Sequence, residues 1–400
     1  MIYYLILSLI SFLSFLPALG LYFVGDDYSF LAIDQLTYPL FIHPQIYHYV
    51  PIPWVILLIL KYFFKTNPFP YHFLVLIIHI VNVLLVKKIS ALFFKRKIWQ
   101  FICALLFSVF FANYEVVFWI TGIFIALSFT FYLLCFSYFA KLLKNSNFKN
   151  FLLFNLFFCL SILSHEYGLT VLIFCLGFML YKSKINFKLL FPPALIFSIV
   201  SLIKAANINS SLLANSSNPR RFAVSLFNFI TYAGFPNPFY WEILYIFKKN
   251  ILVVSVFTLM TLIFSVLLIK KIINNKLVVY QISVIILSGI LFSLTSWTQM
   301  RYFYYFAFPS SIIWVCIFSK FKNKLLLKLS LILFIAPQII FLMQRTKEWT
   351  QASKIVRNET CQSITNNKNL ISSIGDDRWK AYIFTYPENM ADFLFDSKCN

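Results

Sequence analysis

The chain has 400 residues, of which 61% are hydrophobic and only 12% charged, and its mean hydropathy is +0.82. Apolar runs of about 16 to 24 residues recur along it, and such runs are long enough to cross the roughly 30 Å hydrocarbon core of a bilayer. This composition excludes a soluble globular domain. The net charge of +21 does not predict nucleic-acid binding, because the basic residues are distributed as a membrane topology requires.

The apolar runs predict an all-α polytopic membrane protein with about eleven transmembrane helices. Residues 1–24 lack the basic n-region of a cleaved signal peptide, so we expect an uncleaved first span. The predicted spans are 3–24, 70–86, 98–112, 119–140, 150–163, 168–181, 189–204, 250–269, 278–296, 303–319 and 325–343.

Basic residues are concentrated in every second loop between these spans. Five such loops hold 18 Lys and Arg and no Asp or Glu: 87–97, 141–149, 182–188, 270–276 and 320–328. By the positive-inside rule these loops are cytoplasmic, which leaves the N-terminus inside, the C-terminus outside and all 13 acidic residues on the outer side. Loops that are mostly short and the lack of a large external domain favour a bacterial plasma (inner) membrane over the endoplasmic reticulum.

Two external loops, 25–69 and 205–249, are long and partly apolar. The segment 51–60 in the first loop is too short to span a bilayer and predicts an interfacial helix. The second loop holds an aromatic, amphipathic stretch that ends near Trp241. We therefore expect interfacial helices in both loops.

We predict a transmembrane domain over residues 1–343 and a small extracytoplasmic segment over 344–400. Cys361 and Cys399 lie in that segment, in an oxidising compartment, where a disulfide and two free thiols are both open alternatives. The chain has only 8 Gly, and no glycine pattern typical of a nucleotide-binding loop is present.

Two adjacent acids, Asp26 and Asp27, directly follow the first apolar run. Like charges in contact repel and raise one another's pKa, and acidic groups near a bilayer often mark chemistry or ion handling. A carboxylate whose pKa is raised toward neutrality can act as a general base. The pair is therefore the first candidate for a catalytic site.

Further polar residues lie at span ends on the same predicted side: Glu115, the pair His165-Glu166, and Arg301 followed by Tyr302. Each alone is consistent with a solvated loop charge. All of these residues lie at a similar depth on one side of the membrane, so a bundle of helices would gather them around one cavity. A guanidinium suits a phosphate through forked hydrogen bonds, and a lipid-borne phosphate is the donor that an outer face offers.

Five short motifs occur in order along residues 1–311: Asp26-Asp27, Asn67-Pro-Phe-Pro-Tyr-His72 with His79 and Asn82, Glu115 with Trp119-Ile120, Ser164-His-Glu166, and Arg301-Tyr-Phe-Tyr304 with Pro309-Ser310. With these motifs the chain resembles the GT-C superfamily of membrane glycosyltransferases that use polyprenyl- or dolichyl-phosphate sugars. It is most similar to the membrane module of the O-mannosyltransferases that carry tetratricopeptide repeats, and to their bacterial relatives. This sequence has no such repeats, and His165 stands where the family motif has Lys.

The resemblance implies an inverting transfer of a sugar from a polyprenyl-phosphate carrier to a glycan, lipid or protein acceptor on the outer face. It implies Asp26 as the general base, with Asp27 assisting or exchanging roles. The other implied site residues are Arg301 and His165 for the donor phosphate, and Glu115, Glu166 and Tyr302 for the shape of the site. Arg220 and Arg221 belong to no motif of the resemblance, but as external basic residues they are further candidates for the phosphate, in compensation for the Lys that His165 replaces. A reaction without a metal and one with a divalent cation, Mg²⁺ or Mn²⁺, are both open alternatives; Asp26, Asp27 and Glu166 are the candidate ligands for such a cation.

Other classes of protein stay open at this point. A transporter or flippase of lipid-linked glycans would place charges at mid-membrane and show a repeat between halves, and neither is apparent in the sequence. A polymerase or ligase of lipid-linked glycans, or a scaffold without catalysis, are further alternatives. For His79 and Asn82, which lie on one helix face, we favour hydrogen bonds to neighbouring helices over contact with substrate.

Overall fold

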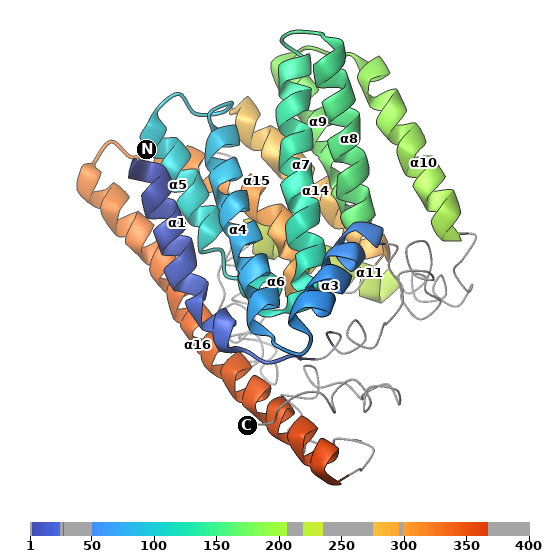
Figure 1. The fold of residues 1–400 in the computed structure, drawn as a ribbon. Coiled ribbons are helices and arrows are strands. Elements are labelled where there is room, and N and C mark those ends of the chain that lie inside the picture. Colours follow the sequence, from blue (N-terminus) through green and yellow to red (C-terminus); the bar gives the residue numbers. More distant parts are fainter. Residues whose placement is uncertain are drawn as a thin grey trace.

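The computed structural model describes residues 2–24, 27, 50–205, 219–234, 275–295 and 299–366, and all regular elements within these ranges are helices (Figure 1). The all-α prediction is confirmed for this part of the chain. By length and composition, five of the described helical segments can cross a membrane: Ile2–Gly20, Phe69–Ser90, Ile120–Leu142, Lys276–Leu294 and Lys324–Asn358. The predicted span 250–269 lies outside the described residues.

Most predicted spans correspond to helices, with bounds that differ by a few residues except at the ends of the first and last spans. They are α1 (Ile2–Phe15), α4 (Phe69–Ser90), α5 (Lys97–Ser108), α7 (Ile123–Leu142), α8 (Phe148–Ser164), α9 (Thr170–Lys182), α10 (Phe191–Ala205), α14 (Lys276–Thr295), α15 (Phe303–Phe318) and α16 (Lys324–Asn366). The first span is shorter as an α-helix than the predicted 3–24. It changes at Phe15 to a 3-10 turn, η1 (Leu16–Gly20), because Pro17 restricts the residue before it.

Consecutive helices run up and down the bundle, so the connections alternate between its two ends (Figure 1). The N-terminus and the basic connections 91–96, 143–147 and 319–323 lie at the upper end. The short α6 (Asn113–Phe118), which precedes η2 (Ile120–Gly122) and α7, lies at the lower end. Which end of the bundle faces the cytoplasm stays a prediction.

Two of the shorter helices belong to the long predicted loops. α3 (Pro51–Phe64) covers the segment predicted as an interfacial helix and packs on α4, α7 and α8. Its Trp54 is buried, whereas Tyr62 and Phe63 near its end are exposed. α11 (Pro219–Gly234) lies in the second loop and packs on α14 and α15.

α16 is 43 residues long and does not end where the sequence predicts a span end, at residue 343. It continues past the lower end of the bundle (Figure 1). The predicted boundary between 1–343 and 344–400 thus falls inside a helix. The alternative of a Cys361–Cys399 disulfide lies outside the described residues, because Cys399 is not among them.

A buried polar network joins three helices in the middle of the bundle. His79 Nδ1 on α4 lies 2.8 Å from the hydroxyl of Tyr304 on α15. Asn82 donates to the carbonyl of Ala126 on α7 at 2.8 Å and accepts from the hydroxyl of Thr130 at 2.8 Å. Unpaired polar groups are costly away from water, so these contacts fix how the helices pack. The prediction that His79 and Asn82 bond to neighbouring helices is confirmed.

Candidate functional site

Asp27 connects the end of the first span to the turn before α7. Its Oδ2 accepts a hydrogen bond from the Val24 amide at 3.0 Å, and its Oδ1 accepts one from the Thr121 amide at 3.1 Å. The residue is 2% exposed. The first amides of a helix have no partner inside that helix, so a carboxylate beside η2 satisfies one of them. Asp26, its neighbour in the predicted pair, lies outside the described residues.

The turn that receives Asp27 depends on a close approach of backbone. After α6 the chain is extended at Trp119 and then forms η2, which ends at Gly122. A Cβ on Gly122 would lie 2.0 Å from the carbonyl oxygen of Val116. Only glycine therefore allows α6 and η2 to fold back on each other and present the Thr121 amide to Asp27.

We expect Gly122→Ala to destabilise the protein by about 1–3 kcal/mol, because overpacking against backbone forces the turn to shift. Gly234→Ala is the matched control, since a Cβ there would meet nothing within 4 Å. Thermal unfolding of both variants in detergent measures the difference. Equal melting temperatures for Gly122→Ala and the wild type would show that the turn is not constrained as described.

Trp119 lies between the acid segment and Arg301. Its Nε1 donates to the carbonyl of Val24 at 3.0 Å. The guanidinium carbon of Arg301 lies 4.6 Å from the centroid of the Trp119 ring. A cation over an indole face is attracted by the ring quadrupole, so Trp119 holds the Arg301 side chain in place while its nitrogen holds the segment before Asp27.

Glu115 on α6 contacts the segment that carries Arg301. Its Oε2 accepts the backbone amide of Arg301 at 3.0 Å. Burial raises the pKa of the Glu115 carboxyl, and the Arg301 charge, together with the backbone amides of Arg301 and Met300, opposes that rise. Glu115 thus fixes the start of η6 (Met300–Tyr302) and places a carboxyl beside the guanidinium.

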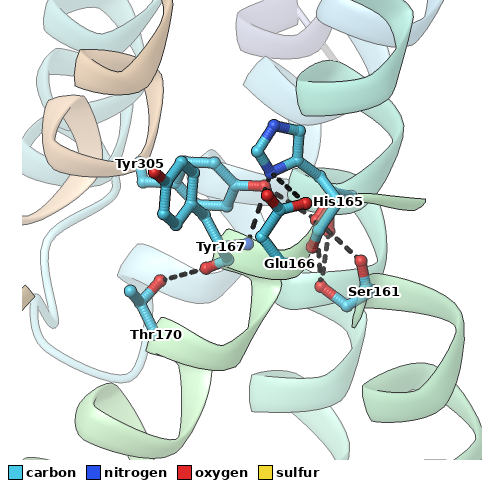
Figure 2. Close-up of polar contacts among 7 residues, drawn as sticks. Ser161, His165, Glu166, Tyr167, Thr170 and Tyr305 are labelled. Carbon is cyan, nitrogen blue, oxygen red and sulfur yellow. Dashed lines mark hydrogen bonds and ion pairs between the residues drawn. The ribbon is translucent and has the colours of Figure 1, made fainter. Parts of the chain in front are cut away.

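His165 and Glu166 lie next to each other at η3 (Glu166–Leu169), between α8 and α9 (Figure 2). His165 Nδ1 accepts the backbone amide of Tyr167 at 3.3 Å and lies 3.8 Å from Glu166 Oε2. The bond from the Tyr167 amide requires an Nδ1 without a proton, whereas an ion pair with Glu166 requires a protonated Nδ1. We assign the neutral ring, because the amide is the closer partner, and its proton then lies on Nε2. Such a ring offers an N–H donor without a fixed charge.

Tyr302 connects these two groups of residues. Its ring centroid lies 6.1 Å from that of His165 and 4.9 Å from that of Tyr167. Burial raises the pKa of Tyr302 to about 12. The positive charge of Arg301 opposes this rise, and the negative charges of Glu166 and Glu115 add to it. The phenol therefore keeps its proton at neutral pH and remains a hydrogen-bond donor.

Helix contacts beneath η3 keep it in position. The hydroxyl of Tyr305 on α15 donates to Ser128 Oγ on α7 at 2.7 Å, and Ser128 Oγ donates to the carbonyl of Ser161 on α8 at 2.8 Å. A Cβ on Gly168 would lie 2.3 Å from Ser161 Oγ, so glycine permits η3 to approach α8. Val24 and Asp27 and the chain connections at residues 113–122, 165–169 and 299–302 are thus linked by these contacts into one continuous site.

α16 also contributes to the site, although hydropathy predicts a span that ends at residue 343. Trp349 packs with its ring centroid 6.1 Å from Trp119, and the Arg345 guanidinium carbon lies 5.9 Å from the centroid of Tyr114. The charge of Arg345 also opposes the raised pKa of Glu115. Arg345 forms an ion pair with Glu348 one helical turn away. A signal was present, because Gln338, Leu342, Arg345, Trp349 and Ser353 repeat at the spacing of one helix face.

Two sets of predicted residues are not assembled by the described structure. Arg220 and Arg221 lie in the first turn of α11. That their side chains reach the donor phosphate stays a prediction. For a metal, no group of three or more His, Cys, Asp or Glu lies together within the described ranges. The described carboxylates alone do not form a cation site, and the predicted Mg²⁺ or Mn²⁺ site depends on Asp26.

Comparisons of the chain with family models, with curated proteins and with solved structures gave no match. What the site does is therefore inferred from its own residues and from the motif resemblance.

Proposed function

We propose that the protein is an integral-membrane glycosyltransferase that moves a sugar from a polyprenyl-phosphate carrier to an acceptor on the extracytoplasmic face. One observation carries the proposal: segments distant in sequence meet at one end of the bundle. Asp27 contacts the turn that carries Trp119, Glu115 and Trp119 contact Arg301, and Tyr302 packs on His165. Several motifs of the GT-C resemblance also touch one another. Glu115 and Trp119 contact Arg301, and His79 contacts Tyr304.

Arg301 binds the donor phosphate in this proposal. A guanidinium offers a planar fork of donors that matches two phosphate oxygens, and its charge stabilises the phosphate as it leaves. The face of Trp119 orients the fork, and the backbone bond to Glu115 fixes the residue along the chain. His165 Nε2–H, Arg220 and Arg221 are the further donors that we assign to the phosphate.

The transfer is a single displacement. Asp26 removes the proton from the acceptor hydroxyl, and the oxygen forms a bond to the anomeric carbon of the sugar. The bond between that carbon and the phosphate oxygen breaks, and its electron pair leaves with the polyprenyl phosphate. Asp26 retains the proton, and the configuration at the anomeric carbon is inverted. Asp27 holds the segment in place through its bonds to the Val24 and Thr121 amides.

The test of the proposal uses the purified full-length chain in lipid nanodiscs. The donors are a panel of labelled polyprenyl-phosphate hexoses, and an envelope extract of the source cells serves as acceptor. We expect one donor of the panel to be consumed and its label to appear in the extract. Persistence of every donor at the level of a protein-free control would contradict the proposal.

The proposed site faces the outside, which is the side opposite to the basic loops. We expect a phosphatase fused after Asn400 to be active and one fused at Asn145 to be inactive, because Asn145 lies in a basic connection at the other end of the bundle. Enzyme activity of the two fusions in whole cells is the measurement. The reverse pattern would place the site on the cytoplasmic side and remove the argument for a lipid-linked donor.

A further inference from the structure

The part of α16 beyond residue 343, residues 344–366, is here called the α16 extension. Sequence hydropathy places it beyond the last apolar span, and in the structure one of its faces packs against the site. Trp349, Ala352, Ser353 and Val356 on this face are buried, whereas Gln351 and Lys354 are exposed. The extension contacts the site at two places.

The first contact is a hydrogen bond to the acid segment. The backbone amide of Tyr22 donates to Ser353 Oγ at 2.6 Å. Two residues further along, the Val24 amide donates to Asp27, and the Val24 carbonyl accepts from Trp119. The chain that leads into Asp26 and Asp27 is therefore held by Ser353 on one side and by Trp119 on the other.

The second contact lies behind Arg301. The ring of Trp349 packs edge-on against that of Phe118, with 6.2 Å between the centroids, and its centroid lies 6.1 Å from that of Trp119. Trp119 in turn contacts Val24 and Arg301. Trp349 is 2% exposed. A side chain packed this closely limits the positions that Trp119 takes.

We propose that Ser353 and Trp349 are positioning residues for sugar transfer: Ser353 sets the place of the segment 22–24 and thereby of Asp27, and Trp349 sets the place of Trp119 and thereby of Arg301. The proposal rests on the proposed glycosyltransferase function. Neither residue reacts, and both act through backbone or ring contacts. The α16 extension is thus a wall of the transfer site and not a separate tail.

Ser353→Ala removes the acceptor of the Tyr22 amide. We expect kcat for transfer to fall about 10- to 100-fold, since small misplacements of a reacting group have effects of this size. The KM for donor should change little, because Arg301 and Trp119 are untouched. Ser353→Thr keeps the oxygen and should restore kcat. Trp349→Ala should instead raise the KM for donor, and Trp349→Phe should restore part of it.

The matched control is Thr350→Val, which deletes a hydroxyl that bonds the Thr346 carbonyl within the same helix. It should leave kcat and KM at wild-type values. Amide hydrogen exchange over residues 22–24 provides a readout that does not depend on enzymatic activity. Exchange there should be faster in Ser353→Ala than in Thr350→Val.

The outcomes separate this inference from the proposed function. If the wild type transfers sugar and Ser353→Ala transfers at the same rate, or if Thr350→Val loses as much, the positioning role is overturned. If the wild type consumes no donor, the glycosyltransferase proposal fails. In that case the amide exchange still tests the contact. If exchange over residues 22–24 is the same in Ser353→Ala as in the wild type, the Ser353 contact is overturned as well. If exchange is faster in Ser353→Ala, the contact is supported as the one that fixes the segment before the acid pair.

Discussion

Asp26→Asn protein should bind polyprenyl-phosphate sugar as the wild type does and fail to transfer it. The substitution keeps the size of the side chain but removes the base, and loss of a general base lowers the rate about 10²–10⁴-fold. Donor binding persists because Arg301 and Trp119 are unchanged. Equilibrium binding of labelled donor to nanodiscs and single-turnover transfer in the same samples give the two quantities.

Asp27→Asn is the informative comparison for that variant. An amide accepts through one oxygen only, so its NH₂ group would face either the Val24 or the Thr121 amide. A buried amide left without an acceptor costs about 1–3 kcal/mol. We expect Asp27→Asn to lower both stability and transfer, whereas Asp26→Asn lowers transfer alone. Wild-type transfer by both variants would eliminate the acid pair as the source of the base.

Arg301→Lys should lose donor affinity although the positive charge is kept. An ammonium cannot reproduce the forked contact and is held less well over the Trp119 face. A hydrogen bond to a charged group is worth about 1.5–3 kcal/mol, which corresponds to roughly a 10- to 100-fold loss in donor binding. The same nanodisc binding measurement detects this loss.

The control for this change is Arg96→Lys, because Arg96 is exposed in a basic connection at the opposite end of the bundle. Arg345 is unsuitable as a control, since its charge acts on Glu115. If Arg301→Lys, Arg96→Lys and the wild type bind donor with equal affinity, Arg301 does not bind the phosphate and is an ordinary solvated charge in a loop.

The sequence predicted the helices well where hydropathy alone decides them. Spans such as 70–86 and 119–140 appear as α4 and α7, and the polar residues at their ends are at the connections where they were expected. The early end of α1 at Phe15 also had a sequence signal in Pro17. The gathering of Glu115 and Arg301 followed from placing both at one end of an alternating bundle.

Two features of the site could not be predicted in this way. The bonding of Asp27 to the Thr121 amide joins residues 94 positions apart, and no local pattern distinguishes Asp27 from Asp26. The site role of α16 was missed because hydropathy falls after residue 343, which marks the end of an apolar span but not of a helix. Periodicity, and not hydropathy, carried the signal for Trp349 and Ser353.

Product analysis of the wild-type reaction tests the central claim most directly. Labelled polyprenyl-phosphate sugar is given to protein in sealed vesicles together with the envelope extract, and the products are separated and examined by NMR. We predict one sugar transferred for each polyprenyl phosphate released, with the anomeric configuration inverted relative to the donor. Intact donor moved to the other leaflet would indicate a transporter. Donor left unconsumed, while polyprenyl diphosphate and a multi-sugar product arise from diphosphate-linked glycans of the extract, would indicate a polymerase or ligase. Either result would contradict a glycosyltransferase that uses a polyprenyl-phosphate sugar.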